Sequence, residues 1–81
     1  VLLAISSSGQ SPNILKGCEV AKEGGAEVVT FSGFEANNSL RGLGRLNFYV
    51  ASLEYGFVEL THMALLSALV DIMIGWRPES V

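Results

Sequence analysis

The sequence predicts an α/β protein with a parallel sheet. Val1 to Ile5 and Ala26 to Phe31 are short apolar runs of the kind that form strands covered on both faces. Between them, apolar residues recur at helical spacing on one face, namely Ile14, Leu15, Cys18 and Ala21. A strand, a helix and a strand in this order form the repeating unit of a parallel sheet.

The first helix has a clear start and a clear end. We expect the Ser11 hydroxyl to cap its first turn, with Pro12 at the first helical position, where a missing N–H costs little. The helix should run to about Glu23, because Gly24 and Gly25 follow as a stop signal.

The second half of the chain predicts a loop, a strand and a long helix. Residues 32–44 are rich in Gly and Asn and should be irregular, with at most a short helical turn, and form a loop able to close over a ligand. A third strand is expected over Asn47 to Val50, and Ser52 to Gly56 should connect it to the last element, with a turn at Tyr55-Gly56. The last helix should span about Phe57 to Ile74 and end at Gly75 and Pro78.

This last helix is apolar on nearly every side, so we expect it to be buried almost all round. A membrane span is the first alternative, but the apolar stretch falls short of about 20 residues and contains Glu59, His62 and Asp71. We favour packing in a helical bundle against a second copy of the chain or against further sequence of the same protein. The expected assembly is a homo-oligomer, a dimer or a tetramer.

Composition limits the class of protein. The 81 residues make at most one small domain, and 49% hydrophobic residues exceed the need of one small core, so we expect a piece of a larger domain. Five Lys and Arg residues and a net charge of −3 argue against nucleic acid as a partner. The single cysteine, Cys18, fits a buried core residue in a reducing compartment, and no secretion signal is recognisable. We therefore expect a cytoplasmic protein.

The segment between the first strand and the first helix predicts a phosphate site. It carries four hydroxyls, those of Ser6, Ser7, Ser8 and Ser11. Backbone N–H groups, hydroxyls and the positive end of a helix dipole then converge where a phosphate can bind. The alternative to a phosphate site is that this segment is only a flexible connection, because Ser and Gly are common turn residues. Lys16 and Arg41 either add positive charge near the phosphate or are solvated surface cations.

Several segments resemble the sugar isomerase (SIS) domain, in its phosphoheptose isomerase branch. Leu2 to Asn13 resembles the second phosphosugar-binding loop, and Val28 to Gly33, Asn47 to Val50 and Tyr55 to His62 follow in the same order. The resemblance implies a flavodoxin-like, three-layer domain, of which residues 1–81 would be the C-terminal half. It also implies that the four serines hold the phosphate of the substrate.

The resemblance further implies an isomerase acting on a sugar phosphate such as sedoheptulose 7-phosphate, with a metal site whose ligands include the last helix. Glu59 falls on one ligand position and is a candidate zinc ligand, but Ser67 stands where the family has a histidine, and a hydroxyl is a poor substitute. Zinc is the cofactor that the resemblance implies, with one of its ligand positions changed.

His62 follows Glu59 by about one helical turn, so the two residues are candidates for catalysis as an acid–base pair or for binding a sugar hydroxyl. The alternative is a satisfied polar pair at a helix interface. Two function classes stay open. One is a ketose–aldose isomerase, and the other is a non-catalytic SIS module that binds phosphosugars for regulation or bridges other proteins.

Overall fold

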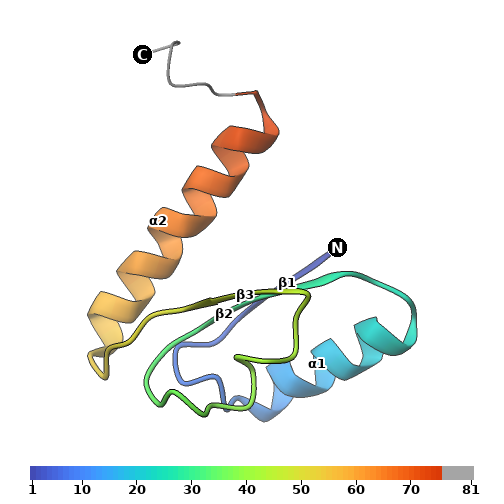
Figure 1. Ribbon diagram of the computed structural model, residues 1–81, viewed down its shortest axis with the longest axis horizontal. Coiled ribbons are helices and arrows are strands. Elements are labelled where there is room, and N and C mark those ends of the chain that lie inside the picture. Colours follow the sequence, from blue (N-terminus) through green and yellow to red (C-terminus); the bar gives the residue numbers. More distant parts are fainter. Residues whose placement is uncertain (76–81) are drawn as a thin grey trace.

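The structure is a computed structural model that describes residues 1–75. Along the chain it contains β1 (Leu2–Ile5), α1 (Pro12–Glu23), β2 (Val28–Ser32), β3 (Leu46–Tyr49) and α2 (Tyr55–Met73), as Figure 1 shows. Pro78, expected to stop the last helix, lies outside the described residues.

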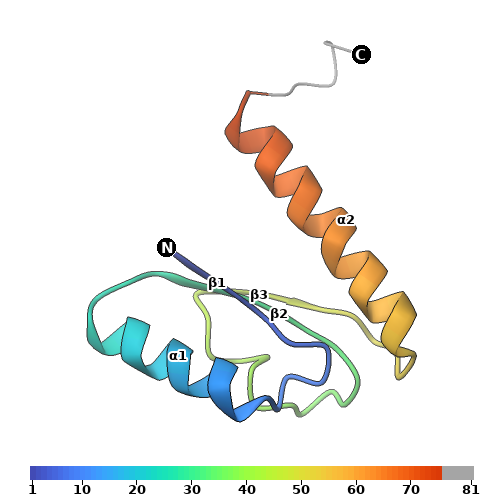
Figure 2. The ribbon, with the colours of Figure 1, turned by 180° about the vertical axis from the view of Figure 1, so that it is seen from behind.

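The three strands form one parallel sheet in the order β1-β2-β3, which confirms the predicted fold class. Side chains in register alternate between the two faces of this sheet. Leu3 of β1 is paired with Val29 of β2, and Val29 with Leu46 of β3, so these three share one face. The helices lie on opposite sides of the strands, α1 on one side and α2 on the other (Figures 1 and 2).

The predicted strand bounds are wrong by one or two residues. β2 begins at Val28 rather than Ala26, because the Ala26 amide donates to the carbonyl oxygen of Ala21 (2.9 Å) and so closes the end of α1. β2 continues to Ser32, and β3 begins and ends one residue earlier than expected. Val50 follows β3 and still donates from its amide to the Ser32 carbonyl (3.0 Å).

The helix α1 packs as its spacing predicted. Its Cys18 side chain is fully buried in a core with Ala4, Val28 and Leu40, and Ile14, Leu15 and Ala21 pack against that core. Gly25, at φ +84°, has the left-handed conformation typical of a residue that follows a helix.

The expected hydroxyl cap is wrong. Ser11 occupies the N-cap position, but its hydroxyl caps no amide of α1. Only its backbone takes part, because the Ser11 carbonyl accepts the first helical hydrogen bond from Leu15 (3.0 Å). The side chain lines the cleft described below and stays available for a ligand.

The helix α2 begins at Tyr55, so the expected turn at Tyr55-Gly56 is instead its first turn. Glu54 has extended backbone angles, and its carbonyl accepts a hydrogen bond from the Val58 amide (3.0 Å), which starts the helix there. Val58 and His62 are the two buried residues of α2 in the described part of the chain.

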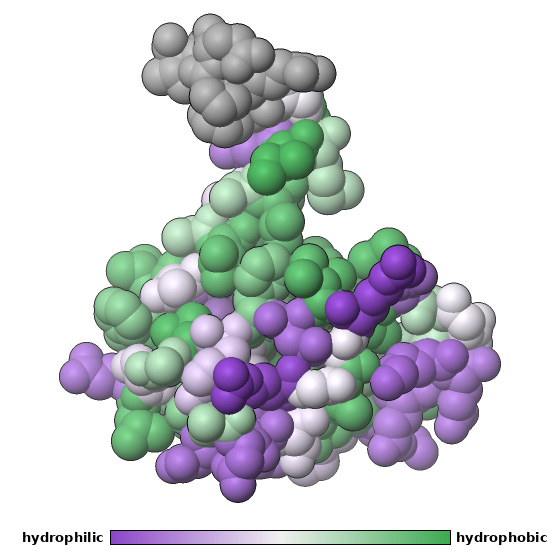
Figure 3. Space-filling model, in the orientation of Figure 1, coloured by the Kyte–Doolittle hydropathy of each residue, from purple (hydrophilic) through white to green (hydrophobic). Residues whose placement is uncertain are grey.

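Most of α2 is exposed within this chain. Hydrophobic residues cover it in Figure 3, and Leu60, Met63 and Met73 are 70%, 63% and 83% exposed. The helix and the sheet face of Leu3, Val29 and Leu46 enclose an apolar cavity of about 360 Å³, which Leu66, Leu69, Val70 and Met73 also line. The apolar sides therefore find no cover among residues 1–75, and packing in an oligomer stays a prediction.

By length and composition alone, α2 is long and apolar enough to cross a membrane. Core helices of soluble proteins can be equally long and apolar, so these two properties do not separate a membrane span from packing in a helical bundle.

Candidate functional site

A cleft of about 490 Å³ lies at the carboxyl end of β1, between the start of α1 and the start of α2. Its lining residues are Ile5, Ser6, Ser7, Ser8, Ser11, Ile14, Phe34, Tyr55 and Glu59. Ligands of parallel α/β sheets bind outside the carboxyl ends of the strands. All four serines that the sequence singled out are therefore together on one candidate site.

The backbone of the serine loop (residues 6–11) leaves sheet pairing immediately after β1. The Ser6 amide makes the last such bond, to the Phe31 carbonyl (3.0 Å), and the Gly9 amide then donates back to the Ser6 carbonyl (3.1 Å). The amides of Ser7 and Ser8, between these two bonds, have no acceptor among residues 1–75. They are free to donate to a ligand.

The hydroxyls of this loop also keep donors for a ligand. The oxygen of Ser6 accepts from the Gly9 amide (3.2 Å), and that of Ser8 from the Gln10 amide (3.1 Å), which leaves the proton of each hydroxyl unused. Within the described residues, the hydroxyls of Ser7 and Ser11 make no hydrogen bond.

The start of α1 adds a favourable field for an anion. The first N–H groups of a helix have no partner within the helix, and they carry the positive end of its dipole. No acidic side chain lies in the first turn of α1 to neutralise this end. The serine loop and the helix start thus form a neutral but electropositive lining.

The opposite wall of the cleft comes from the segment after β2, which the sequence marked as a loop able to close over a ligand, without naming Phe34 as a site residue. Gly33 packs so closely that an added Cβ would lie 2.6 Å from Val58 Cγ1 and 3.0 Å from the Ser7 carbonyl oxygen. Phe34 follows in a left-handed conformation (φ 59°), rare for a bulky residue and typical of functional sites. Its amide is held by the Ser52 carbonyl (2.9 Å), and its carbonyl by the Tyr49 hydroxyl (2.8 Å).

The first turn of α2 supplies the polar end of the cleft. Glu59 and Tyr55 lie one turn apart and both line it. A hydrogen bond to Glu59 and the negative charge of its carboxylate raise the pKa of the Tyr55 hydroxyl. Tyr55 was expected only as a turn residue, and the signal that places it beside Glu59 is the helical spacing of four.

His62 lies behind the cleft rather than on its lining. Its ring is 2% exposed, packs edge-on against Phe31, and has Nε2 2.8 Å from the Ser32 carbonyl oxygen. Because a carbonyl only accepts, Nε2 carries the proton and donates. Nδ1 is buried and has no partner among the described residues. Glu59 therefore lines the cleft, whereas His62 is buried against the sheet. Their joint role in catalysis stays a prediction.

The two cations considered for the phosphate lie outside the lining. Arg41 stacks over the Tyr49 ring (4.0 Å to its centroid) and donates to the Ala36 carbonyl (2.7 Å). Lys16 lies 3.8 Å from Glu19 on the exposed side of α1. Phosphate binding in this cleft would rely on neutral donors.

The described residues do not by themselves assemble a zinc site. Zinc takes three or four Cys, His, Asp or Glu ligands, and within residues 1–75 no three such side chains lie close enough together to hold a metal ion. Ser67 is exposed on α2, about two helical turns beyond Glu59. Glu59 as a metal ligand and zinc as a cofactor stay predictions.

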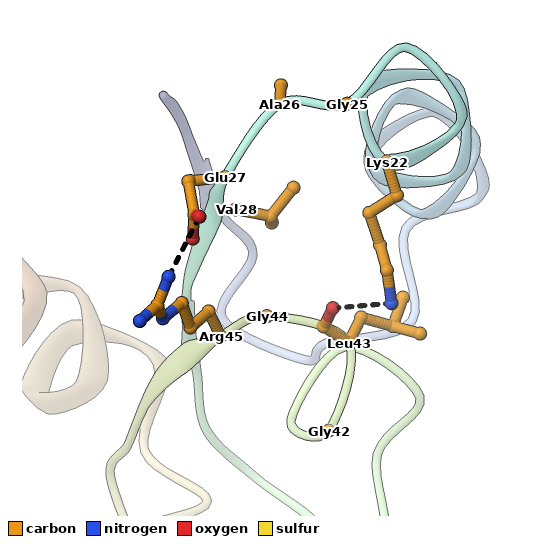
Figure 4. A pocket seen from close by; sticks show the side chains of 9 residues that line it. All are labelled: Lys22, Gly25, Ala26, Glu27, Val28, Gly42, Leu43, Gly44 and Arg45. Atoms are coloured by element: carbon orange, nitrogen blue, oxygen red, sulfur yellow. Dashed lines mark hydrogen bonds and ion pairs between the residues drawn. The ribbon is translucent and has the colours of Figure 1, made fainter.

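A second cavity, of about 410 Å³, lies near the amino ends of β2 and β3 and is shown in Figure 4. Its charged groups are already engaged. Lys22 donates to the Leu43 carbonyl (3.0 Å), and Arg45 pairs with Glu27 (2.9 Å), as the dashed lines in Figure 4 mark. This cavity is at the wrong end of the sheet for a typical α/β ligand site.

Comparison with known proteins supports the family expectation in part. The chain is 32% identical over 75 residues to the phosphoheptose isomerase of Colwellia psychrerythraea strain 34H. This alignment covers 90% of the chain but only 38% of the relative's length. No family model matches the chain, and no solved structure matches it. The match supports a relationship to the SIS family, and the fold is compatible with part of a flavodoxin-like SIS domain.

Proposed function

We propose that this chain forms the phosphate end of a phosphosugar-binding site. The observation that carries the proposal is the cleft at the carboxyl end of β1, where Ser6, Ser7, Ser8 and Ser11 lie together at the start of α1. Unpartnered amides, hydroxyl protons and a helix dipole are the donors that phosphate binding needs, and they suffice without a cation.

The rest of the cleft suits a sugar. Ile5, Ile14 and Phe34 give it apolar walls, and Glu59 and Tyr55 give it polar groups away from the serine loop. The negative carboxylate of Glu59 would repel a phosphate placed beside it, so Glu59 is better suited to bind the sugar hydroxyls. A sugar phosphate offers both chemistries in one molecule.

We further propose that the protein is a ketose–aldose isomerase acting on a heptose phosphate such as sedoheptulose 7-phosphate. The relationship to a phosphoheptose isomerase supports this choice. Such a reaction removes a proton from the carbon beside the carbonyl and returns a proton to the former carbonyl carbon, while a hydroxyl proton moves to the other oxygen. Glu59 is the candidate base, since it is the only carboxylate among the lining residues of the cleft.

A non-catalytic phosphosugar-binding module is the second candidate. It is favoured by the position of His62, whose Nε2 is engaged by the Ser32 carbonyl and whose ring is not part of the cleft lining. Glu59 then lacks an imidazole partner for the second proton transfer. Ser67 in place of a histidine points the same way.

Calorimetric titration tests the binding proposal. The protein should bind sedoheptulose 7-phosphate and fail to bind sedoheptulose at the same concentration, because the phosphate supplies most of the contacts. Equal binding of the two sugars would refute a phosphate site. An assay for an aldose product, run with and without Zn²⁺, then separates the isomerase from the binding module.

A further inference from the structure

Asn38 is an almost fully buried amide in the loop between β2 and β3, 5% exposed and outside the lining of the cleft. Its Nδ2 lies within hydrogen-bond distance of three acceptors, Ser32 Oγ (3.2 Å), the Gly33 carbonyl (3.0 Å) and the Glu35 carbonyl (3.0 Å). Its Oδ1 accepts from the Arg41 amide (2.8 Å). A buried amide with this many partners has its side chain fixed in one orientation.

The side chain of Asn38 packs directly against Gly9 of the serine loop. Gly9 is buried at φ +68°, and a Cβ placed there would lie 2.0 Å from Asn38 Oδ1 and 2.2 Å from Asn38 Cγ. The Gly9 carbonyl also accepts a hydrogen bond from the Leu40 amide (3.0 Å). Gly9 is therefore held by the 33–41 loop through both packing and backbone bonding.

Gly9 in turn sets the shape of the loop that would hold the phosphate. Its amide donates to both the carbonyl and the hydroxyl oxygen of Ser6. The unpartnered amides of Ser7 and Ser8 lie within the turn that these bonds close. A shift of Gly9 would move those two donors together.

We propose that Asn38 is a positioning residue for phosphate binding, acting through Gly9 to hold the Ser7 and Ser8 amides in their binding conformation. The inference rests on the proposed function of the serine loop. It assigns a role to a residue that touches no ligand, and it predicts that the two loops respond to substitution as one unit.

The first test compares two single-atom changes on neighbouring asparagines. Asn38→Asp keeps the shape of the side chain but loses the donor, whereas Asn37→Asp introduces the same charge at an exposed position. With sedoheptulose 7-phosphate as the probe, Asn38→Asp should raise the Kd about tenfold or more, the size of a lost interaction with a charged group. Asn37→Asp should change it less than about twofold, a difference within ordinary surface effects.

The second test asks whether Asn38 acts through Gly9. Gly9→Ala should raise the Kd, because its Cβ meets the Asn38 side chain. Asn38→Gly should also raise the Kd, because the positioning side chain is lost. The double variant Gly9→Ala with Asn38→Gly no longer contains the steric contact, so its fold-increase in Kd should be smaller than the product of the fold-increases of the two single variants.

The outcomes separate this inference from the proposed function. A lower unfolding midpoint with an unchanged Kd in Asn38→Asp, or independent effects of the two positions, would show that Asn38 serves only the fold. If Asn38→Gly does not fold, the comparison of Asn38→Asp with Asn37→Asp still decides. A wild-type protein that does not bind the probe would refute the proposed function itself.

Discussion

The Nε2 atom of His62 donates a hydrogen bond to the carbonyl oxygen of Ser32 across 2.8 Å. This bond joins α2 to the carboxyl end of β2, and the neighbouring contact of Val58 with Gly33 supports it. Together these contacts place the first turns of α2, with Glu59, beside the serine loop.

Removing this bond should destabilise the protein. We expect His62→Ala to lower the free energy of unfolding by about 1 to 3 kcal/mol, because a buried hydrogen bond and the edge-on packing of the ring against Phe31 are lost. The Ser32 carbonyl keeps its bond from the Val50 amide. His62→Gln retains an N–H donor and should cost less. Thr61→Ala, at a partly exposed position where the hydroxyl bonds only to the Phe57 carbonyl of the same helix, should cost less than about 0.5 kcal/mol. Urea unfolding measures all three, and a His62→Ala value equal to that of Thr61→Ala would contradict the role given to this bond.

The Ser11 hydroxyl offers a clean test of the phosphate site. It makes no hydrogen bond among the described residues, so Ser11→Ala should leave the unfolding midpoint unchanged. The affinity for sedoheptulose 7-phosphate should fall by about 1 to 3 kcal/mol, because a hydrogen bond to a charged group is lost. Ser52→Ala, outside the cleft, is the control. Equal Kd values for the two variants, measured by calorimetry, would argue against the assignment of Ser11.

Glu59 is expected to matter for turnover rather than for phosphate affinity. If the protein is an isomerase, Glu59→Gln should reduce kcat by about 100-fold or more, since the base is lost. The Kd for the sugar phosphate should not rise by a similar factor, because a negative charge has left the cleft. Glu54→Gln, at the N-cap of α2, changes the same charge outside the cleft lining and should retain activity. A Glu59→Gln variant with wild-type kcat would exclude Glu59 as the base.

The ionisation of Tyr55 reports on its contact with Glu59. The hydrogen bond and the charge of Glu59 both favour the protonated phenol, so they raise its pKa above 10.0. In Glu59→Gln the charge is absent, and the Tyr55 pKa should move down toward 10.0. Tyrosinate absorbance, measured with and without Tyr55→Phe to isolate its signal, follows this shift. Superimposable titration curves for the wild type and Glu59→Gln would show that the two side chains do not interact in solution.

The exposed apolar surface of α2 predicts a homo-oligomer. Light scattering should give a mass above that of one chain, and Leu60→Lys with Met63→Lys should lower it, because charges cannot be buried in a helical interface. Val20→Lys makes the same kind of change on α1, where the side chain is 56% exposed, and should leave the mass unchanged. A monomeric wild type would contradict this prediction, and flotation with lipid vesicles would favour the membrane alternative instead.

Elements marked by local signals were predictable from the sequence. Pro12 and the Gly24-Gly25 pair fix the ends of α1 to the residue, and the apolar runs give the parallel strands. The serine loop followed from these two, because a helix that starts directly after a strand must place the loop between them at the carboxyl end of the sheet.

The rest of the cleft depends on contacts between distant segments. Phe34 meets the serine loop only because β2 pairs beside β1, and no local pattern marks its left-handed conformation. The sequence also did not show the different environments of Glu59 and His62. Residues three apart on a helix differ by about 60° in direction, enough to turn one toward the cleft and the other toward the sheet. The sequence shows their spacing but not which of them faces β2.

A crystal structure of the protein with sedoheptulose 7-phosphate tests the central claim most directly. Phosphate oxygens within hydrogen-bond distance of the Ser7 and Ser8 amides and of the Ser11 hydroxyl are the predicted result. A serine loop that stays empty at saturating sugar phosphate, or a phosphate bound instead between Lys22 and Arg45 at the other end of the sheet, would contradict the account.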